Sequence, residues 1–211
     1  MFKNKTMKKF LASIATAAFL ASILIPTAAS AKSFKDVPET NNVHLEAIDV
    51  LSNEGIINGY DDGTFKPGNN ITRGQVAKIF ARLLDDEGKL VQVFKDVPVT
   101  LADKELVRAA FTVNDYEVMT GSNGYLFPAK NMTRQQMAKV LVEGLWLDHV
   151  EGEESQVTDL DKAYPEFREY IQILSENGIT NVTEFRPTEP VSRAQFASFV
   201  YRALLTFEEE E

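Results

Sequence analysis

An internal repeat of about 60 residues constrains this chain more than any other feature of its sequence. The motif Phe-Lys-Asp-Val-Pro and its weaker relatives occur three times, at Phe34–Pro38, Phe94–Pro98 and Val157–Leu160. A second mark, with proline in its third place, recurs at Phe65–Pro67, Leu126–Pro128 and Phe185–Pro187. A third mark, an apolar residue followed by Thr or Ser, Arg, a variable residue and Gln, recurs at Ile71–Gln75, Met132–Gln136 and Val191–Gln195. Because the three marks keep the same order, the chain consists of three copies of one unit.

Each unit is predicted to form a helix, a turn and a second helix. In the first unit, an apolar stripe with three-residue spacing runs from Leu45 to Leu51, and Gly55 ends that helix. Asp61–Gly63 then indicates a turn. The second helix carries apolar residues at i, i+3, i+4 and i+7 from Val76 to Leu84. Since a two-helix unit cannot cover its own apolar face, we expect a mainly α fold in which three tandem helix-turn-helix units pack around a shared core.

The N-terminal segment has the features of a signal peptide. Lysines precede an apolar run that extends from Phe10 to Pro26, and Ala29–Ala31 offers the small residues that a signal peptidase accepts. The alternative is a retained membrane anchor, since the uncharged stretch is nearly long enough to span a bilayer. The expected organisation is a signal peptide at 1–31, units at 32–90, 91–151 and 152–206, and an acidic tail at 207–211.

The charge and composition exclude several classes of function. Residues 32–211 hold 18 basic and 31 acidic residues, a net charge of −13, which argues against binding a nucleic-acid backbone. The chain has no cysteine and only two histidines, so thiolate zinc sites, cysteine nucleophiles and multi-histidine metal sites are excluded. We therefore expect no catalytic residue, no metal and no cofactor.

The third mark places an arginine where a helix disfavours it. Its Thr or Ser and its Gln are explained by a capping box. The arginine itself occupies the first helical position, where the helix dipole disfavours a cation by about 0.3–1 kcal/mol. A carboxylate partner within the protein could compensate, and so could an external anion held beside free helix amides. If the arginines serve an external anion, exchanging Arg73 and Arg134 together for alanine should spare folding.

The first unit resembles an S-layer homology repeat, and the second and third units resemble the same family more weakly. The resemblance rests on Phe34–Pro38, Gly55–Pro67 and Ile71–Gln75. It implies a pseudo-threefold, three-pronged bundle. It also implies a secreted protein held non-covalently at the cell wall or S-layer of a Gram-positive bacterium. The implied ligand is a pyruvylated secondary cell-wall polysaccharide, bound in grooves between the repeats.

The resemblance also implies which residues bind. In the family, the arginine of the Thr-Arg motif meets the acidic ketal on the sugar. This role falls here on Arg73, Arg134 and Arg193, and the associated aspartates are Asp36, Asp96 and Asp159. From the turn of the first unit, Gly59 and Tyr60 are added as ligand-binding residues.

One departure from the family pattern concerns a tryptophan early in the first helix of each repeat. Its places here are taken by Val43, Glu105 and Glu166. Aromatic residues that could replace it are Tyr60, Tyr125 and Phe167. The turn sequence typical of the family survives only in the first unit. We therefore expect the groove that involves the first unit to be the most competent, and the third to be structural.

Two other classes of function remain for comparison. The scaffold could serve as a protein-interaction or S-layer assembly module with a degenerate sugar site. An exported enzyme is disfavoured, because the repeats leave no residues for a catalytic domain. The expected partners are an anionic cell-wall polysaccharide and other surface-layer proteins, with no nucleic acid and, after signal cleavage, no membrane.

Overall fold

The computed structural model describes residues 33–207, so the predicted signal peptide and most of the acidic tail lie outside the described residues. Within 33–207 the regular elements are all helical. They are α2 (Leu45–Asn53), α3 (Arg73–Leu83), α4 (Lys104–Asp115), α5 (Arg134–Leu145), η1 (Leu160–Lys162), η2 (Pro165–Phe167), α6 (Arg168–Glu176) and α7 (Arg193–Leu205). None of these helices combines the length and the hydrophobicity that crossing a bilayer requires.

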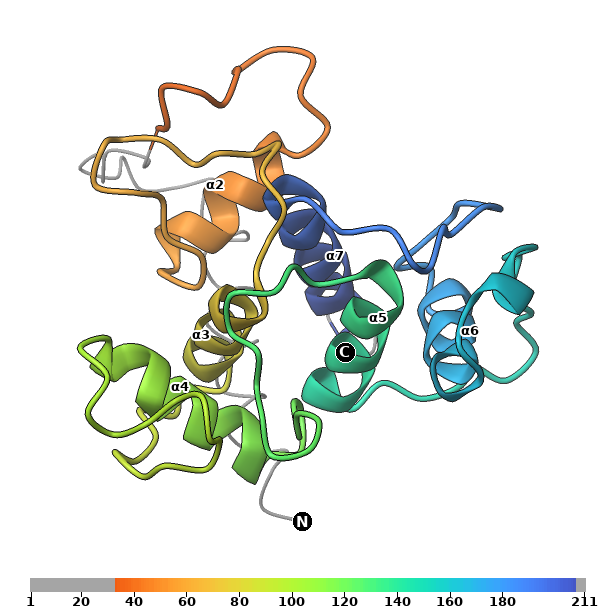
Figure 1. The fold of residues 1–211 in the computed structure, drawn as a ribbon. Helices are drawn as coiled ribbons and strands as arrows, with labels where there is room; N and C mark the ends of the chain where they lie inside the picture. The colour runs from red at the N-terminus through yellow and green to blue at the C-terminus, as the bar shows by residue number, and fades with distance from the viewer. Residues whose placement is uncertain (1–32, 208–211) are drawn as a thin grey trace.

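The second helices of the three units lie at the centre, and the first helices lie outside them (Figure 1). Each first helix packs against the second helix of a neighbouring unit: α4 on α3, α6 on α5, and α2 on α7. The last of these contacts joins the first unit to the third and closes the arrangement into a ring. The expected three-pronged bundle is therefore confirmed, and each prong contains helices from two different units.

A closed ring of main-chain hydrogen bonds joins the three units at the centre. Ile71 donates to the carbonyl of Val191 (3.0 Å), Val191 to that of Met132 (3.0 Å), and Met132 to that of Ile71 (2.9 Å). All three residues are fully buried. Because each unit supplies one donor and one acceptor, no unit can satisfy this ring alone.

The second helices begin with the predicted capping boxes. Thr72, Thr133 and Ser192 accept a hydrogen bond from the Gln three residues later, whose side chain bonds back to the capping residue's amide. The next amides are also occupied: Arg73 donates to the carbonyl of Lys130 (2.9 Å) and Gly74 to that of Pro128 (2.9 Å). Equivalent bonds start α5 and α7. Of the two alternatives for the arginines, the one that placed free helix amides beside them is therefore wrong in that respect, because the neighbouring unit's turn uses these amides.

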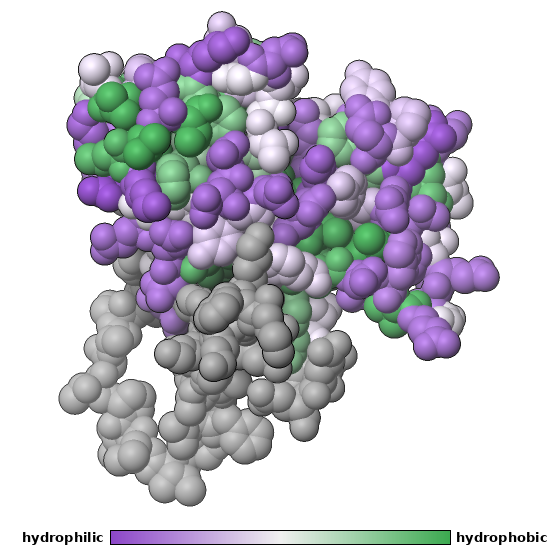
Figure 2. Space-filling model, turned by 90° about the horizontal axis from the view of Figure 1, so that it is seen from below, coloured by the Kyte–Doolittle hydropathy of each residue, from purple (hydrophilic) through white to green (hydrophobic). Residues whose placement is uncertain are grey.

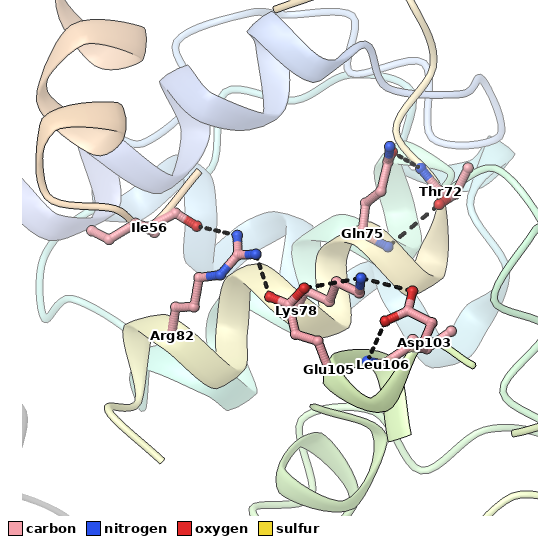
Figure 3. A network of polar contacts seen from close by, with 8 residues as sticks. All are labelled: Ile56, Thr72, Gln75, Lys78, Arg82, Asp103, Glu105 and Leu106. Atoms are coloured by element: carbon pink, nitrogen blue, oxygen red, sulfur yellow. Dashed lines mark hydrogen bonds and ion pairs between the residues drawn. The ribbon is translucent and has the colours of Figure 1, made fainter. Parts of the chain in front are cut away.

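Charged side chains tie α3 to α4 along one prong (Figure 3). Lys78 pairs with Asp103 (2.8 Å) and Glu105 (3.0 Å). Arg82 pairs with Glu105 and also donates to the carbonyl of Ile56 (3.2 Å) in the first unit. Because these groups are partly exposed, each pair adds little stability, but together they fix how the two helices lie side by side.

The core is rich in large side chains, and the surface is mainly polar. Phenylalanines from all three units are fully buried, namely Phe65, Phe80, Phe94, Phe185 and Phe196. Figure 2 shows a face on which hydrophilic side chains dominate and hydrophobic ones form separate small patches.

Replacing Glu117 with glycine is expected to stabilise the protein. The second residue after each first helix is left-handed, with φ of +71° at Gly55, +61° at Glu117 and +66° at Gly178. Only the second unit places a side chain there, and a left-handed conformation without glycine is strained. Thermal unfolding should show a gain of about 0.5–1 kcal/mol for Glu117→Gly. Exposed Glu151→Gly serves as a control, and an equal or lower stability of Glu117→Gly would contradict the prediction.

Candidate ligand site at the unit junctions

Each motif aspartate holds the turn of its own unit. Asp36 accepts hydrogen bonds from the amides of Phe65 (2.7 Å) and Lys66 (2.8 Å). The other two units repeat this arrangement, with Asp96 binding Leu126 and Phe127, and Asp159 binding Phe185 and Arg186. Both oxygens of each carboxylate are therefore engaged by main-chain donors.

Each motif arginine binds the same turn from the neighbouring unit. The Nε atom of Arg193 donates to the carbonyl of Phe65 (2.8 Å), whose amide Asp36 holds. In the same way Arg73 binds Leu126 (2.7 Å) and Arg134 binds Phe185 (2.5 Å). An arginine of one unit and an aspartate of the next thus hold one residue of the turn between them. This contact with the neighbouring unit explains why an arginine stands at the first position of each second helix, which the local helix sequence left unexplained.

The arginines and aspartates act on each other through space. No direct ion pair joins them within residues 33–207. Burial lowers the pKa of Arg73, and the negative charge of Asp96 opposes that shift. Burial likewise lowers the pKa of Arg134 and Arg193. Since the pKa of arginine lies far above neutrality, all three guanidinium groups stay protonated at neutral pH.

The three guanidinium groups differ in how far the protein already uses them. Arg193 is 3% exposed and donates a second hydrogen bond, from Nη2 to the carbonyl of Asn58 (2.9 Å). Arg134 is 5% exposed. Arg73 is only partly buried, and neither of its Nη atoms bonds to any residue in the described part of the chain. Arg134 also donates only through Nε among residues 33–207, so Arg73 differs from it in being the more exposed of the two.

The structure also places Gly59 and Tyr60, whose ligand-binding roles stay predictions. A Cβ on Gly59 would lie 2.2 Å from a ring carbon of Phe34, so glycine is required there by packing. The Tyr60 hydroxyl accepts a hydrogen bond from Gln75 (2.9 Å). Its ring lies 3.9 Å from Lys66 Nζ and 5.0 Å from the Cζ atom of Arg193, so Tyr60 belongs to the Arg193 junction.

Two lysines near the Arg73 junction were missed by sequence reasoning. Lys95 Nζ lies 5.2 Å from the ring centre of Tyr125, and Lys130 Nζ lies 4.2 Å from that of Phe127. Lys95 and Tyr125 are 30 residues apart, and no short motif links them. A comparison of the three turns would have been the one usable signal, because only the second turn has aromatic residues on both sides of its central residue, at Tyr125 and Phe127.

Neither a metal cluster nor a cavity between α3 and α4 offers a competing site within residues 33–207. Within residues 33–207 no cluster of three His, Cys, Asp or Glu side chains could hold a metal ion. A cavity of about 560 Å³ lies between α3 and α4, lined in part by Lys78, Arg82 and Glu105. Because these two cations already pair with Glu105, they attract an external anion less than Arg73 does.

The two histidines should make opposite contributions to stability as the pH changes. His44 meets Ser198 across the ring closure (Nδ1–Oγ 2.7 Å), and burial, together with Arg202, lowers its pKa. The unfolded chain then protonates first, so this contribution is lost as the pH falls below about 6.5. A hydrogen bond with Glu176 raises the pKa of His149, so its contribution is present at low pH and is lost as the pH rises through the raised pKa.

Melting curves between pH 5 and 8 on His44→Gln and His149→Gln would separate these contributions. Relative to the wild type, His44→Gln should lose less stability on acidification, and His149→Gln should lose more. If both variants followed the wild-type pH profile, the assignment to these two side chains would be refuted.

Comparison with known proteins shows which family and which proteins this chain is similar to. The family model for the S-layer homology domain matches residues 33–77 and 158–197. The chain is 30% identical to the surface-layer 125 kDa protein of Lysinibacillus sphaericus, over 97% of this chain and 18% of that protein. It is 33% identical to the S-layer protein EA1 of Bacillus anthracis, over 95% of this chain and 23% of that protein.

A relative with a different name shares the same region. The cellulosome-anchoring protein of Acetivibrio thermocellus is 29% identical, over 70% of this chain and 35% of that protein. The chain thus spans between 18% and 35% of the length of these three relatives.

Proposed function

The chain belongs to the S-layer homology domain family, and on that premise we propose that its three units fasten a protein to the cell surface by binding an acidic polysaccharide of the cell wall. The relatives named for surface layers and for cellulosome anchoring support the anchoring role. The sugar that we propose is a pyruvylated one, because a ketal-linked pyruvate presents the carboxylate that a guanidinium binds best.

One observation carries this proposal. Arg73 retains its charge in a partly buried junction, and its two Nη atoms have no bonding partner among residues 33–207. An arginine whose fork of donors is left open suits a planar, two-oxygen acceptor. Arg193 bonds through both Nε and Nη2, and Arg134, whose Nη atoms also have no bonding partner among residues 33–207, is almost fully buried.

The overall charge of the protein sets the character of this binding. Residues 32–211 carry a net charge of −13, so an anionic polymer meets overall repulsion. Binding then depends on the arginines at the junctions, and we expect it to weaken as salt screens their charge. We propose an anchoring role in place of catalysis, with the polysaccharide and other surface-layer proteins as partners.

Co-sedimentation with cell-wall sacculi tests the proposal. Residues 32–211 would be mixed with intact sacculi and with sacculi stripped of their secondary polymer by hydrofluoric acid. Binding to intact walls alone is the expected result. Equal binding to both would refute the polymer as ligand, and no binding by a well-folded protein would favour a protein-assembly module instead.

A further inference from the structure

Three of the eleven glycines in the chain follow an asparagine, at Asn58–Gly59, Asn123–Gly124 and Asn177–Gly178. An Asn-Gly pair can lose ammonia without an enzyme, because the glycine nitrogen carries no side chain beside it that hinders its attack on the asparagine side-chain carbonyl. The reaction needs a free asparagine side chain, a free glycine amide and a backbone that can rotate into the attacking geometry. The structure holds the three pairs differently on each of these points.

The pair in the third unit is held closed at the end of α6. The side-chain amide of Asn177 donates hydrogen bonds to the carbonyls of Ile173 (2.8 Å) and Asp148 (2.9 Å). The amide of Gly178 donates to the carbonyl of Ser175 (3.1 Å). Because both reacting groups are already hydrogen-bonded, this pair reacts only after the end of the helix opens.

The pair in the first unit has an exposed asparagine but a constrained backbone. The carbonyl of Asn58 accepts a hydrogen bond from Arg193 Nη2 (2.9 Å), a contact between the first and third units. Gly59 packs so closely on Phe34 that a Cβ there would lie 2.2 Å from a ring carbon. Rotation of this pair therefore has to break a junction contact and move a packed ring.

The pair in the second unit lies at the exposed tip of a two-residue turn. Ser122 and Tyr125 close the turn with two main-chain hydrogen bonds of 2.9 Å each. Asn123 (φ +52°) and Gly124 (φ +80°) are both left-handed, as a type I′ turn requires. Within residues 33–207 neither the side chain of Asn123 nor the amide of Gly124 has a hydrogen-bond partner. Since all four turn residues are exposed, opening the turn costs little.

Lys95 lies against the peptide group that would react. Its Nζ atom donates a hydrogen bond to the carbonyl of Asn123 (3.2 Å). This carbonyl and the Gly124 nitrogen belong to one peptide group, so the negative charge that forms when the nitrogen loses its proton is shared with the oxygen beside Lys95. A nearby ammonium group stabilises that charge.

We infer that Asn123 is a site of spontaneous deamidation, and that Lys95 promotes the reaction. The Gly124 nitrogen loses its proton to hydroxide and forms a bond to Cγ of Asn123. The bond between Cγ and Nδ2 breaks, and the side-chain nitrogen leaves as ammonia with a proton from water. Water then opens the resulting succinimide at one of its two carbonyls. Opening at Cγ leaves aspartate, and opening at the main-chain carbonyl leaves isoaspartate, whose main chain runs through Cγ.

Both products place a new carboxylate beside Lys95 at the tip of the turn. Isoaspartate also adds one carbon to the main chain between Ser122 and Tyr125, so it alters the spacing of the two hydrogen bonds that close the turn. This inference does not depend on the proposed function, because the reaction needs only water and the chain itself.

Peptide mapping by mass spectrometry measures the three sites in one sample, after timed incubation of folded residues 32–211 at mildly alkaline pH. Asn123 should deamidate at least about tenfold faster than Asn177, because its pair opens at a lower free energy. Asn58 should also react more slowly than Asn123. In denaturant the three rates should become similar, since the contacts that separate them are lost. If Asn123 reacts no faster than Asn177 in the folded protein, the inference is overturned.

Two substitutions at Lys95 test its role in the reaction. Lys95→Gln removes the charge and should slow deamidation of Asn123 by about two- to fivefold, the range for one exposed charge contact. Lys95→Arg keeps the charge and should react like the wild type. The Asn177 rate in the same samples is the internal reference and should stay unchanged. Equal Asn123 rates in Lys95→Gln and the wild type would overturn the promoting role of Lys95.

Discussion

Arg193→Ala should lower the free energy of unfolding by about 3 kcal/mol, since two hydrogen-bonded carbonyls lose a donor and a buried side chain leaves a void. The two carbonyls belong to Phe65 and Asn58, in the first unit. The Arg193 side chain is almost fully buried and lies over two aromatic rings. The substitution therefore weakens the closure between the third unit and the first.

Thermal unfolding would measure this effect. A loss of about 3 kcal/mol in a domain of this size corresponds to a melting temperature about 6–12 °C lower. Arg168→Ala is the matched control, because exposed Arg168 also binds main-chain carbonyls, those of Ala163 and Asp161 (3.2 Å each). The control should lose no more than about 1 kcal/mol. A melting temperature of Arg193→Ala equal to that of the control would show that the junction adds no stability.

This result would also revise the expectation that alanine at Arg73 and Arg134 spares folding. Arg134 is 5% exposed, donates to the carbonyl of Phe185, and lies over two rings. Its loss should cost nearly as much as the loss of Arg193. A binding experiment on the double alanine variant would thus confuse weaker binding with weaker folding, and Arg73 has to be changed alone.

Arg73→Gln should weaken binding of the polymer by about thirtyfold or more, the effect of removing one member of a buried charge pair, about 2–5 kcal/mol. Its structural role is smaller than that of Arg193, because a single hydrogen bond joins its side chain to Leu126. Loss of that bond should cost about 1 kcal/mol of stability. Binding and folding therefore respond to very different degrees in this variant.

Titrations at two salt concentrations would check the prediction. Wild-type binding should weaken at higher salt, and Arg73→Gln should show a smaller salt dependence because one charge contact is gone. Arg168→Gln, which removes an exposed arginine of the third unit, should bind like the wild type. Equal affinities of Arg73→Gln and the wild type would refute the role of Arg73.

Local features of this fold were readable from the sequence, because their signals lie within a few residues. The capping boxes at Thr72, Thr133 and Ser192 follow from side chains three residues apart, and the structure confirms them. Gly55 was expected to end the first helix. In the structure α2 ends at Asn53, and Gly55, two residues later, has a positive φ. The three-unit architecture followed from the repeat itself.

The partners of the helices and of the arginines could not be read in the same way. An apolar stripe does not state which helix covers it, so the packing of α2 on α7 required the structure. The arginines bind main-chain carbonyls of residues such as Leu126, and a carbonyl leaves no mark in the sequence. For the same reason the use of the helix amides by the neighbouring turn was not foreseen.

The recognition of a carboxylate on the sugar can be tested directly by changing the polymer and leaving the protein intact. Purified secondary polymer would be titrated with residues 32–211 before and after mild acid removes its ketal-linked pyruvate. Binding should be strong before this treatment and should fall at least about thirtyfold after it, the same loss that we expect for Arg73→Gln. Equal affinity for the treated and untreated polymer would contradict binding through the arginines.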